Sequence, residues 1–333
     1  MAARLTIEAT PAGLRPGRSC PLAYRYGPAS LGGPATIQAD TLWVAGGLYG
    51  NRFALARLLE QFAAERGRKA LVFNGDFHWF DVDPEDFAAV ERGVAVHRAT
   101  RGNVETELAM PAAGAGCGCS YPAWVGDAEV ARSNRIIERL RATAAASPEA
   151  CARLAALPMV RVAEVGGERV AIVHGDSDSL AGWNFSQERL ATSEGVAQAR
   201  SALARANVRL FASSHSCLPV LQAVAGAAGS MRGAIVNNGA AGMPNFAGTR
   251  YGLATRISVT PSASALYATR VGRLSVEAIA IDFDAEAWTA RFLQQWPEGT
   301  DAYASYFSRM VDGPRYRLEQ ALRVAEASRR FAA

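Results

Sequence analysis

Short apolar runs alternate with amphipathic stretches along the first third of the chain. The segment TLWVAG, residues 41–46, is continuously apolar, which is typical of a strand buried on both faces. Apolar residues at helical spacing follow at 55–62, and KALVFNGD, residues 69–76, indicates a second strand. A helix near 84–93 leads to a third strand that ends at Asn103. This β-α-β-α-β order predicts a parallel sheet, with ligands bound outside the carboxyl ends of its strands.

The middle of the chain adds helices and a hairpin to this pattern. A Gly-rich loop at 106–127 precedes two helical stretches, near 128–145 and 148–156. The segment MVRVAEVGGERVAIVHGD predicts a hairpin that turns at its paired glycines and whose second strand ends at His174. A helix over 186–205 is followed by VRLFASSHSC and by further strands. The pattern therefore predicts an α/β protein with polar groups at several strand ends.

The domain organisation follows from the absence of repeats and linkers. We expect residues 1–40, rich in Pro, Gly and Arg, to form an irregular arm. Residues 41–283 then form one α/β domain, and residues 284–333 form C-terminal helices packed on it. Half of the 333 residues are apolar, which is enough for one large core.

Charge and cysteine content narrow the class of protein. The net charge of +4 is small for this length, which disfavours nucleic-acid binding and favours a small anionic substrate. Five cysteines are an odd number in a long chain, so a disulfide framework is not expected. Neither a signal peptide nor a membrane span is evident, which predicts a cytoplasmic protein without a membrane partner. The sequence leaves a homo-oligomer open.

Four polar residues stand where predicted strands stop. They are Asp76, Asn103, His174 and His215. Each alone could be a turn residue or a satisfied core residue, but four such coincidences are less plausible than one site. One carboxylate, one amide oxygen and two imidazoles suit Zn, Mn or Fe.

The flanking residues resemble successive motifs of the calcineurin-like metallophosphoesterases. The motifs occur in that family's order as FNGDFHWFD, RGNVE, VAIVHGD and SSHSC. A later segment, VNNGAAGMPNF, is similar to one in the family's small bacterial phosphodiesterase branch. The resemblance runs from about residue 40 to 260 and implies a four-layer αββα sandwich. It also implies two metal ions, bridged by the aspartate that matches Asp76.

This sequence departs from the family pattern at four positions. Gly47 and Tyr49 replace an aspartate and a histidine, Val104 replaces a histidine that assists catalysis, and Cys217 replaces the last histidine. The ligand losses fall on the first of the two metals, whereas the second keeps its matched set. We therefore expect a variant centre with one divalent ion rather than two.

The cysteines offer a way to rebuild the lost site. Cys217 as a thiolate could be a further metal ligand, and Cys117 and Cys119 lie in a Gly-rich loop that could fold close to an ion. The alternatives are that Cys217 is a small buried residue and that the other two are loop residues without a partner.

Four other residues are candidates for catalysis or substrate binding. His78 follows Asp76 by two residues and could replace the acid missing at Val104, and Tyr49 could hydrogen-bond a substrate oxygen. Arg25 could clasp an anion if the arm folds over the site, and Asn238 lies in the phosphodiesterase-like segment.

Three functions are compatible with these features. The first is a metal-dependent hydrolase of phosphate esters, either mono- or diesters. The second is a repurposed metalloenzyme with a cysteine-containing centre and a non-phosphate substrate. The third is a metal-binding scaffold protein without catalysis. The matched ligands favour the first.

Overall fold

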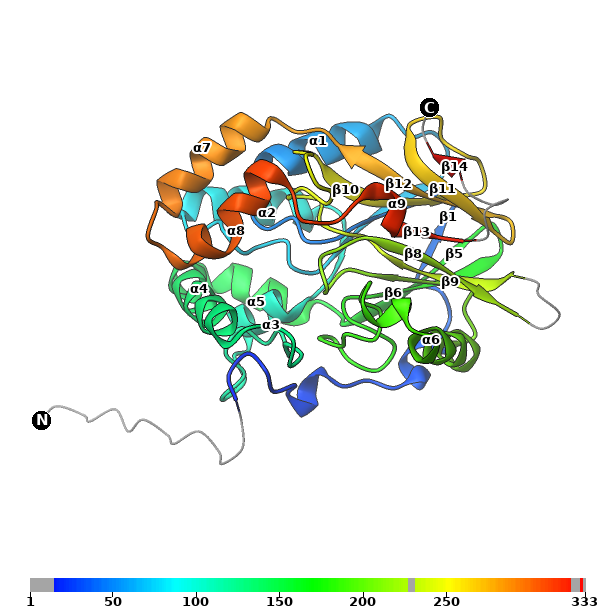
Figure 1. Ribbon diagram of the computed structural model, residues 1–333, viewed down its shortest axis with the longest axis horizontal. Coiled ribbons are helices and arrows are strands. Elements are labelled where there is room, and N and C mark those ends of the chain that lie inside the picture. Colours follow the sequence, from blue (N-terminus) through cyan, green and yellow to red (C-terminus); the bar gives the residue numbers. More distant parts are fainter. Residues whose placement is uncertain (1–14, 227–230, 325–329, 332–333) are drawn as a thin grey trace, which may run out of the picture.

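Two seven-stranded sheets form the centre of the molecule (Figure 1). The computed structural model describes residues 15–226, 231–324 and 330–331. The first sheet has the order β1-β5-β6-β7-β9-β8-β13, with the bounds Ile37–Ala39, Val160–Val165, Glu168–Val173, Leu210–Ser213, Met231–Asn237, Val220–Ala225 and Leu322–Arg323. The second has the order β14-β11-β12-β10-β2-β3-β4, with the bounds Arg330–Phe331, Ala265–Val271, Leu274–Ile281, Gly252–Ser258, Thr41–Ala45, Lys69–Asn74 and Arg98–Thr100.

The predicted parallel arrangement of the first three long segments is confirmed. β2 pairs with β3 and β3 with β4, both in parallel, so that Phe73 lies between Ala45 and Ala99. In the first sheet β6, β7 and β9 are also parallel neighbours. The carboxyl ends of β3, β6 and β7 therefore open toward a common edge of the two sheets.

Helices cover the outer face of each sheet. The α-helices α1 to α9 span Arg52–Ala63, Pro84–Ala95, Asn103–Ala109, Asp127–Ala145, Pro148–Ala156, Ser193–Ala206, Ala285–Gln295, Asp301–Asp312 and Leu318–Ala321. Short 3-10 turns η1, η2 and η3 lie at Leu22–Tyr24, Pro28–Leu31 and Arg189–Ala191. Figure 1 shows α6 on the outer side of the first sheet, and α1, α2 and α7 beyond the second.

Three apolar layers separate these elements. Val44 and Val276 of the second sheet meet Ile172 and Leu210 of the first in a core between the sheets. A second core joins the other face of the second sheet to α1 and α2, and a third joins the first sheet to α6. The order helix, sheet, sheet, helix confirms the predicted four-layer αββα sandwich.

Several predicted boundaries are wrong. The third strand covers only Arg98–Thr100, because α2 continues to Ala95 and Asn103 is the first residue of α3. The helix predicted over 186–205 begins only at Ser193.

The C-terminal segment is helical in α7 to α9 but also contributes β13, which pairs in parallel with β8, a strand that the sequence pattern did not reveal. This pairing covers that side of β8 at Leu221 and Gln222. Among the described residues, no helix combines the length and apolar character needed to cross a membrane.

Candidate metal centre

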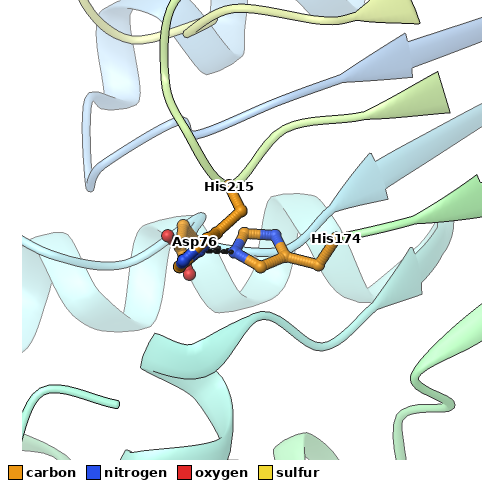
Figure 2. Close-up of side chains that lie close together, drawn as sticks. All are labelled: Asp76, His174 and His215. Carbon is orange, nitrogen blue, oxygen red and sulfur yellow. Dashed lines mark hydrogen bonds and ion pairs between the residues drawn. The ribbon is translucent and has the colours of Figure 1, made fainter. Parts of the chain in front are cut away.

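The four residues that follow the strand ends converge on one point. Asp76 comes two residues after β3, Asn103 opens α3, His174 follows β6 directly, and His215 lies two residues beyond β7. Figure 2 shows the Asp76 carboxylate and the two imidazoles turned toward one another. The site therefore joins loops from both sheets.

Two glycines allow these loops to approach so closely. A Cβ on Gly75 would lie 2.5 Å from His174 Nδ1, and a Cβ on Gly102 would lie 2.4 Å from Asp76 Oδ1. Gly75 and Asp76 both have left-handed backbone, with φ of 76° and 53°. Glycine adopts this conformation readily, whereas it is sterically unfavourable for most other residues. The backbone at Asp76 is therefore strained, and this conformation directs its side chain to the site.

The distances between the four side chains suit coordination of one ion. His174 Nε2 lies 3.3 Å from Asp76 Oδ2, 3.2 Å from Asn103 Oδ1 and 3.2 Å from His215 Nδ1. Ligands of one transition metal, with bonds of about 2.1 Å, are roughly 3.0–3.4 Å apart in octahedral or tetrahedral geometry.

The hydrogen bonds on the far sides of these groups leave lone pairs at the centre. His174 Nδ1 donates to the Asn74 carbonyl at 2.8 Å, and His215 Nε2 donates to the Cys119 carbonyl at 2.8 Å. The Asn103 amide Nδ2 donates to the Cys117 carbonyl at 3.0 Å, so its Oδ1 faces inward. With neutral imidazoles, two nitrogen lone pairs, an amide oxygen and a carboxylate meet without a proton between them. Such a set repels itself unless a cation lies among its members, and the residues therefore fit a divalent metal.

The electrostatics of the metal-free protein agree with this arrangement. Burial opposes ionisation of Asp76, but His174 and His215 outweigh it and lower the pKa of that carboxyl. Burial and then the neighbouring His174 lower the pKa of His215 to about 4, so its lone pair stays free at neutral pH. Burial disfavours a charged His174, yet Asp76 outweighs burial and raises the pKa of that imidazole. A divalent ion bound there would need His174 as the neutral imidazole, so it would compete with a proton for that ring.

Glu105 fixes the loop that carries Asp76. Its buried carboxylate accepts hydrogen bonds from the backbone N–H groups of Asp76, Phe77 and Gly102, at 2.8, 3.0 and 2.8 Å. Burial and the nearby Asp76 raise the pKa of Glu105 to about 7. Glu105 belongs to the RGNVE motif, but its role could not be predicted from the sequence.

The position expected to have lost its metal is filled by side chains. A Cβ on Gly47 would lie 2.2 Å from Cζ and 2.5 Å from Oη of Tyr49, so the tyrosine ring occupies the space of the missing aspartate. The Tyr49 hydroxyl donates to Cys217 Sγ at 2.7 Å, and this thiol donates to the His215 carbonyl at 3.2 Å. Burial raises the pKa of both Tyr49 and Cys217, which keeps them as phenol and thiol.

The structure does not bring the cysteine thiols into the ligand group. Among the described residues, the His, Cys, Asp and Glu side chains close enough to share an ion here are Asp76, His174 and His215. Cys217 is engaged with Tyr49, and burial raises the pKa of the Cys119 thiol. Cys117 and Cys119 act instead through their carbonyl oxygens, which orient Asn103 and His215. The sequence could not reveal this, because every residue has a carbonyl group.

His78 lies away from the site in a buried ionic network. Its Nδ1 is 2.6 Å from Asp81 Oδ2 and its Nε2 is 3.0 Å from Glu91 Oε1, while its ring stacks on Phe87. Burial opposes the imidazolium, but the two carboxylates outweigh it and raise the pKa of His78 to about 10. With both ring nitrogens occupied and no exposed surface, His78 does not reach a substrate and does not replace the acid missing at Val104.

The two expected substrate-binding residues also lie outside the pocket. Arg25 forms a backbone bridge with Ser179, and its side chain is exposed to solvent. Asn238 is fully buried and donates from Nδ2 to Ser214 Oγ at 3.1 Å. Neither is among the residues that line the cavity beside the site.

This cavity has a volume of about 60 Å³ and opens to solvent. Three ligand candidates line it, and the remaining lining residues are Tyr49, Trp79, Val104, Cys119, Tyr121, Trp183, Cys217, Tyr306 and Arg309. The walls are mainly aromatic, and Trp183 packs edge-on against His215 with ring centres 5.2 Å apart. Sequence reasoning missed Trp183, Tyr306 and Arg309, since no motif surrounds them.

Comparisons with known proteins agree with this architecture. No family model matches the sequence, and no curated protein matches it. A hypothetical protein from Pyrococcus horikoshii has a similar structure, with a TM-score of 0.54 and 16% identity over 83% of this chain and 99% of its own. A metallophosphoesterase from Sphaerobacter thermophilus gives a TM-score of 0.50 and 15% identity over 82% of this chain and 100% of its own. The chain therefore has the metallophosphoesterase fold, which confirms the calcineurin-like resemblance at the level of the fold.

Proposed function

We propose that this protein is a metal-dependent hydrolase of phosphate esters that works with a single divalent ion. The observation that carries the proposal is the meeting of four inward-facing acceptors, on Asp76, Asn103, His174 and His215, beside an open pocket. The fold shared with a metallophosphoesterase supports the choice of phosphate esters over other substrates. A bound divalent ion supplies Lewis acidity toward a phosphoryl oxygen.

The chain's own residues prepare the pocket for such a substrate. The carbonyls of Asn74, Cys117 and Cys119 fix the orientation of three ligand side chains. The aromatic walls offer apolar surface to the alcohol part of an ester. The Tyr49 hydroxyl also lines the pocket and is held in place by Cys217.

Metal stoichiometry and hydrolysis together test this function. We expect protein purified without added metal to carry about one transition-metal ion per chain by elemental analysis and to hydrolyse members of a panel of phosphate mono- and diesters. His174→Ala should lose both the ion and the activity. His97→Ala is the matched control, because this histidine packs against Phe62 and Phe73 away from the site. A protein that holds the ion firmly yet leaves the whole panel intact would contradict the proposal and favour a metal-binding scaffold.

A further inference from the structure

Arg309 brings a positive charge to the wall of the pocket from the C-terminal part of the chain. It lies on α8, which packs against α4 and reaches the site from outside the strand-end loops. Among the described residues that line the pocket, Arg309 is the one with a permanent positive charge. It forms no ion pair with any described carboxylate, in contrast to Arg135, Arg256 and Arg291.

The hydrogen bonds of Arg309 hold the guanidinium in place without saturating it. Its Nε donates to the Pro244 carbonyl at 3.2 Å, and its Nη2 donates to the Cys217 carbonyl at 3.0 Å. A guanidinium has five N–H donors. Those of Nη1, and the second of Nη2, have no partner in the described part of the chain. Arg309 is half-buried, and a guanidinium that is held in place with free donors is suited to bidentate binding of an oxyanion.

The location of this charge complements the filled metal position. Arg309 holds the Cys217 carbonyl, and the Cys217 thiol accepts the hydrogen bond from Tyr49, whose ring occupies the space above Gly47. The side of the pocket that lacks room for a second cation therefore has a guanidinium close by. Three of the four candidate metal ligands, Asp76, Asn103 and His215, line the same pocket.

We propose that Arg309 is the anion-binding residue of this pocket and holds the non-bridging oxygens of a phosphoryl group beside the single metal centre. The proposal deepens the proposed function and rests on it for the class of ligand, a tetrahedral phosphate. Arg309 supplies a fixed positive charge from the C-terminal helices. The charge lies on the side of the pocket where Tyr49 and Cys217 fill the space of a second metal ion. It is a binding and positioning residue for the phosphoryl group.

The same two hydrogen bonds also dock α8, so the test must separate binding from docking. Inorganic phosphate is the probe, and its affinity for the metal-loaded full chain is measured by titration calorimetry for wild type, Arg309→Gln and Arg309→Lys. The matched control is Arg135→Gln, which breaks the bond from α4 to Asp301 of α8, outside the pocket. Metal content and thermal stability are recorded for each protein.

We expect Arg309→Gln to bind phosphate at least tenfold more weakly while keeping its ion, and Arg309→Lys to recover part of the affinity because it keeps the charge without the fork. Arg135→Gln should bind phosphate as the wild type does, even where it lowers stability. Wild-type affinity in Arg309→Gln, or an equal loss in Arg135→Gln, would overturn the inference. If phosphate binding depends on Arg309 but no ester is hydrolysed, the proposed function is wrong and the anion-binding role of Arg309 holds. If esters are hydrolysed but phosphate affinity does not depend on Arg309, the proposed function holds and the role of Arg309 is wrong.

Discussion

At the scale of single residues, the site combines four candidate ligands with a neighbouring position that the Tyr49 ring fills. Asp76, Asn103, His174 and His215 present lone pairs to one point because each has a hydrogen-bonding partner on its other side or a backbone that aims it. On the filled side, Tyr49 has a left-handed backbone with φ of 56°. That conformation turns its ring over Gly47. The ring fits there because residue 47 has no side chain, so the two residues depend on each other.

The contact between Gly47 and Tyr49 gives a double-mutant prediction. Gly47→Ala places a Cβ 2.2 Å from the Tyr49 ring and should destabilise the protein by about 1–3 kcal/mol through overpacking. In a Tyr49→Ala background the same change should cost much less, because the ring that it meets is gone. Free energies of unfolding from urea titrations of the wild type, both single variants and the double variant measure the coupling. Costs that simply add would show that the two residues are independent.

At the scale of elements, the Gly-rich loop between α3 and α4 orients the centre through its backbone. The carbonyls of Cys117 and Cys119 accept from Asn103 and His215, and the indole of Trp183 donates to the Cys119 carbonyl at 3.0 Å. Gly118, between the two cysteines, has φ of 69°. The loop thus presents carbonyls two residues apart toward the ligands, a geometry that requires a glycine at its centre.

Substitution of Gly118 should therefore loosen the metal site without touching a ligand. In Gly118→Ala the new Cβ would lie 2.4 Å from the Tyr24 hydroxyl and would sit on a left-handed backbone. We expect metal affinity to fall roughly tenfold or more, as for the loss of other groups that orient ligands. Gly126→Ala, in the same connection but with open space around its Cβ position, should keep wild-type affinity. Competition with a chromophoric chelator measures both, and equal affinities in the two variants would refute the role of the loop carbonyls.

Some parts of the site could be predicted from the sequence, and others could not. Asp76, Asn103, His174 and His215 were recognisable because strand ends are local patterns, and parallel strands bring their carboxyl ends to one edge. The loop carbonyls were not recognisable, since no side chain marks them. The role of Arg309 could not be predicted for another reason. It is 92 residues from the carbonyl that it binds, and only the packing of α8 brings the two together.

At the scale of the whole molecule, segments from both ends of the chain support the site. α8 contributes Tyr306 and Arg309 to the pocket. On the opposite side, the segment around η1 lays the buried Tyr24 against Glu107 of α3, the helix that opens with Asn103. The central sandwich therefore supplies the ligands, while the flanking segments hold the loops and helices that carry them.

The bond between Tyr24 and Glu107 makes the contribution of the N-terminal segment measurable. Glu107 is a buried carboxylate that accepts from the Tyr24 hydroxyl and, at 2.6 Å, from Arg141 Nη2. Tyr24→Phe removes one charged hydrogen bond and should lower the free energy of unfolding by about 2 kcal/mol. Tyr303→Phe is the control, since the Tyr303 hydroxyl makes no hydrogen bond in the described part of the chain. Because Arg141 still holds Glu107, we expect Tyr24→Phe to keep its metal ion. Metal loss in Tyr24→Phe at temperatures where the protein stays folded would show instead that this segment holds Asn103 in position.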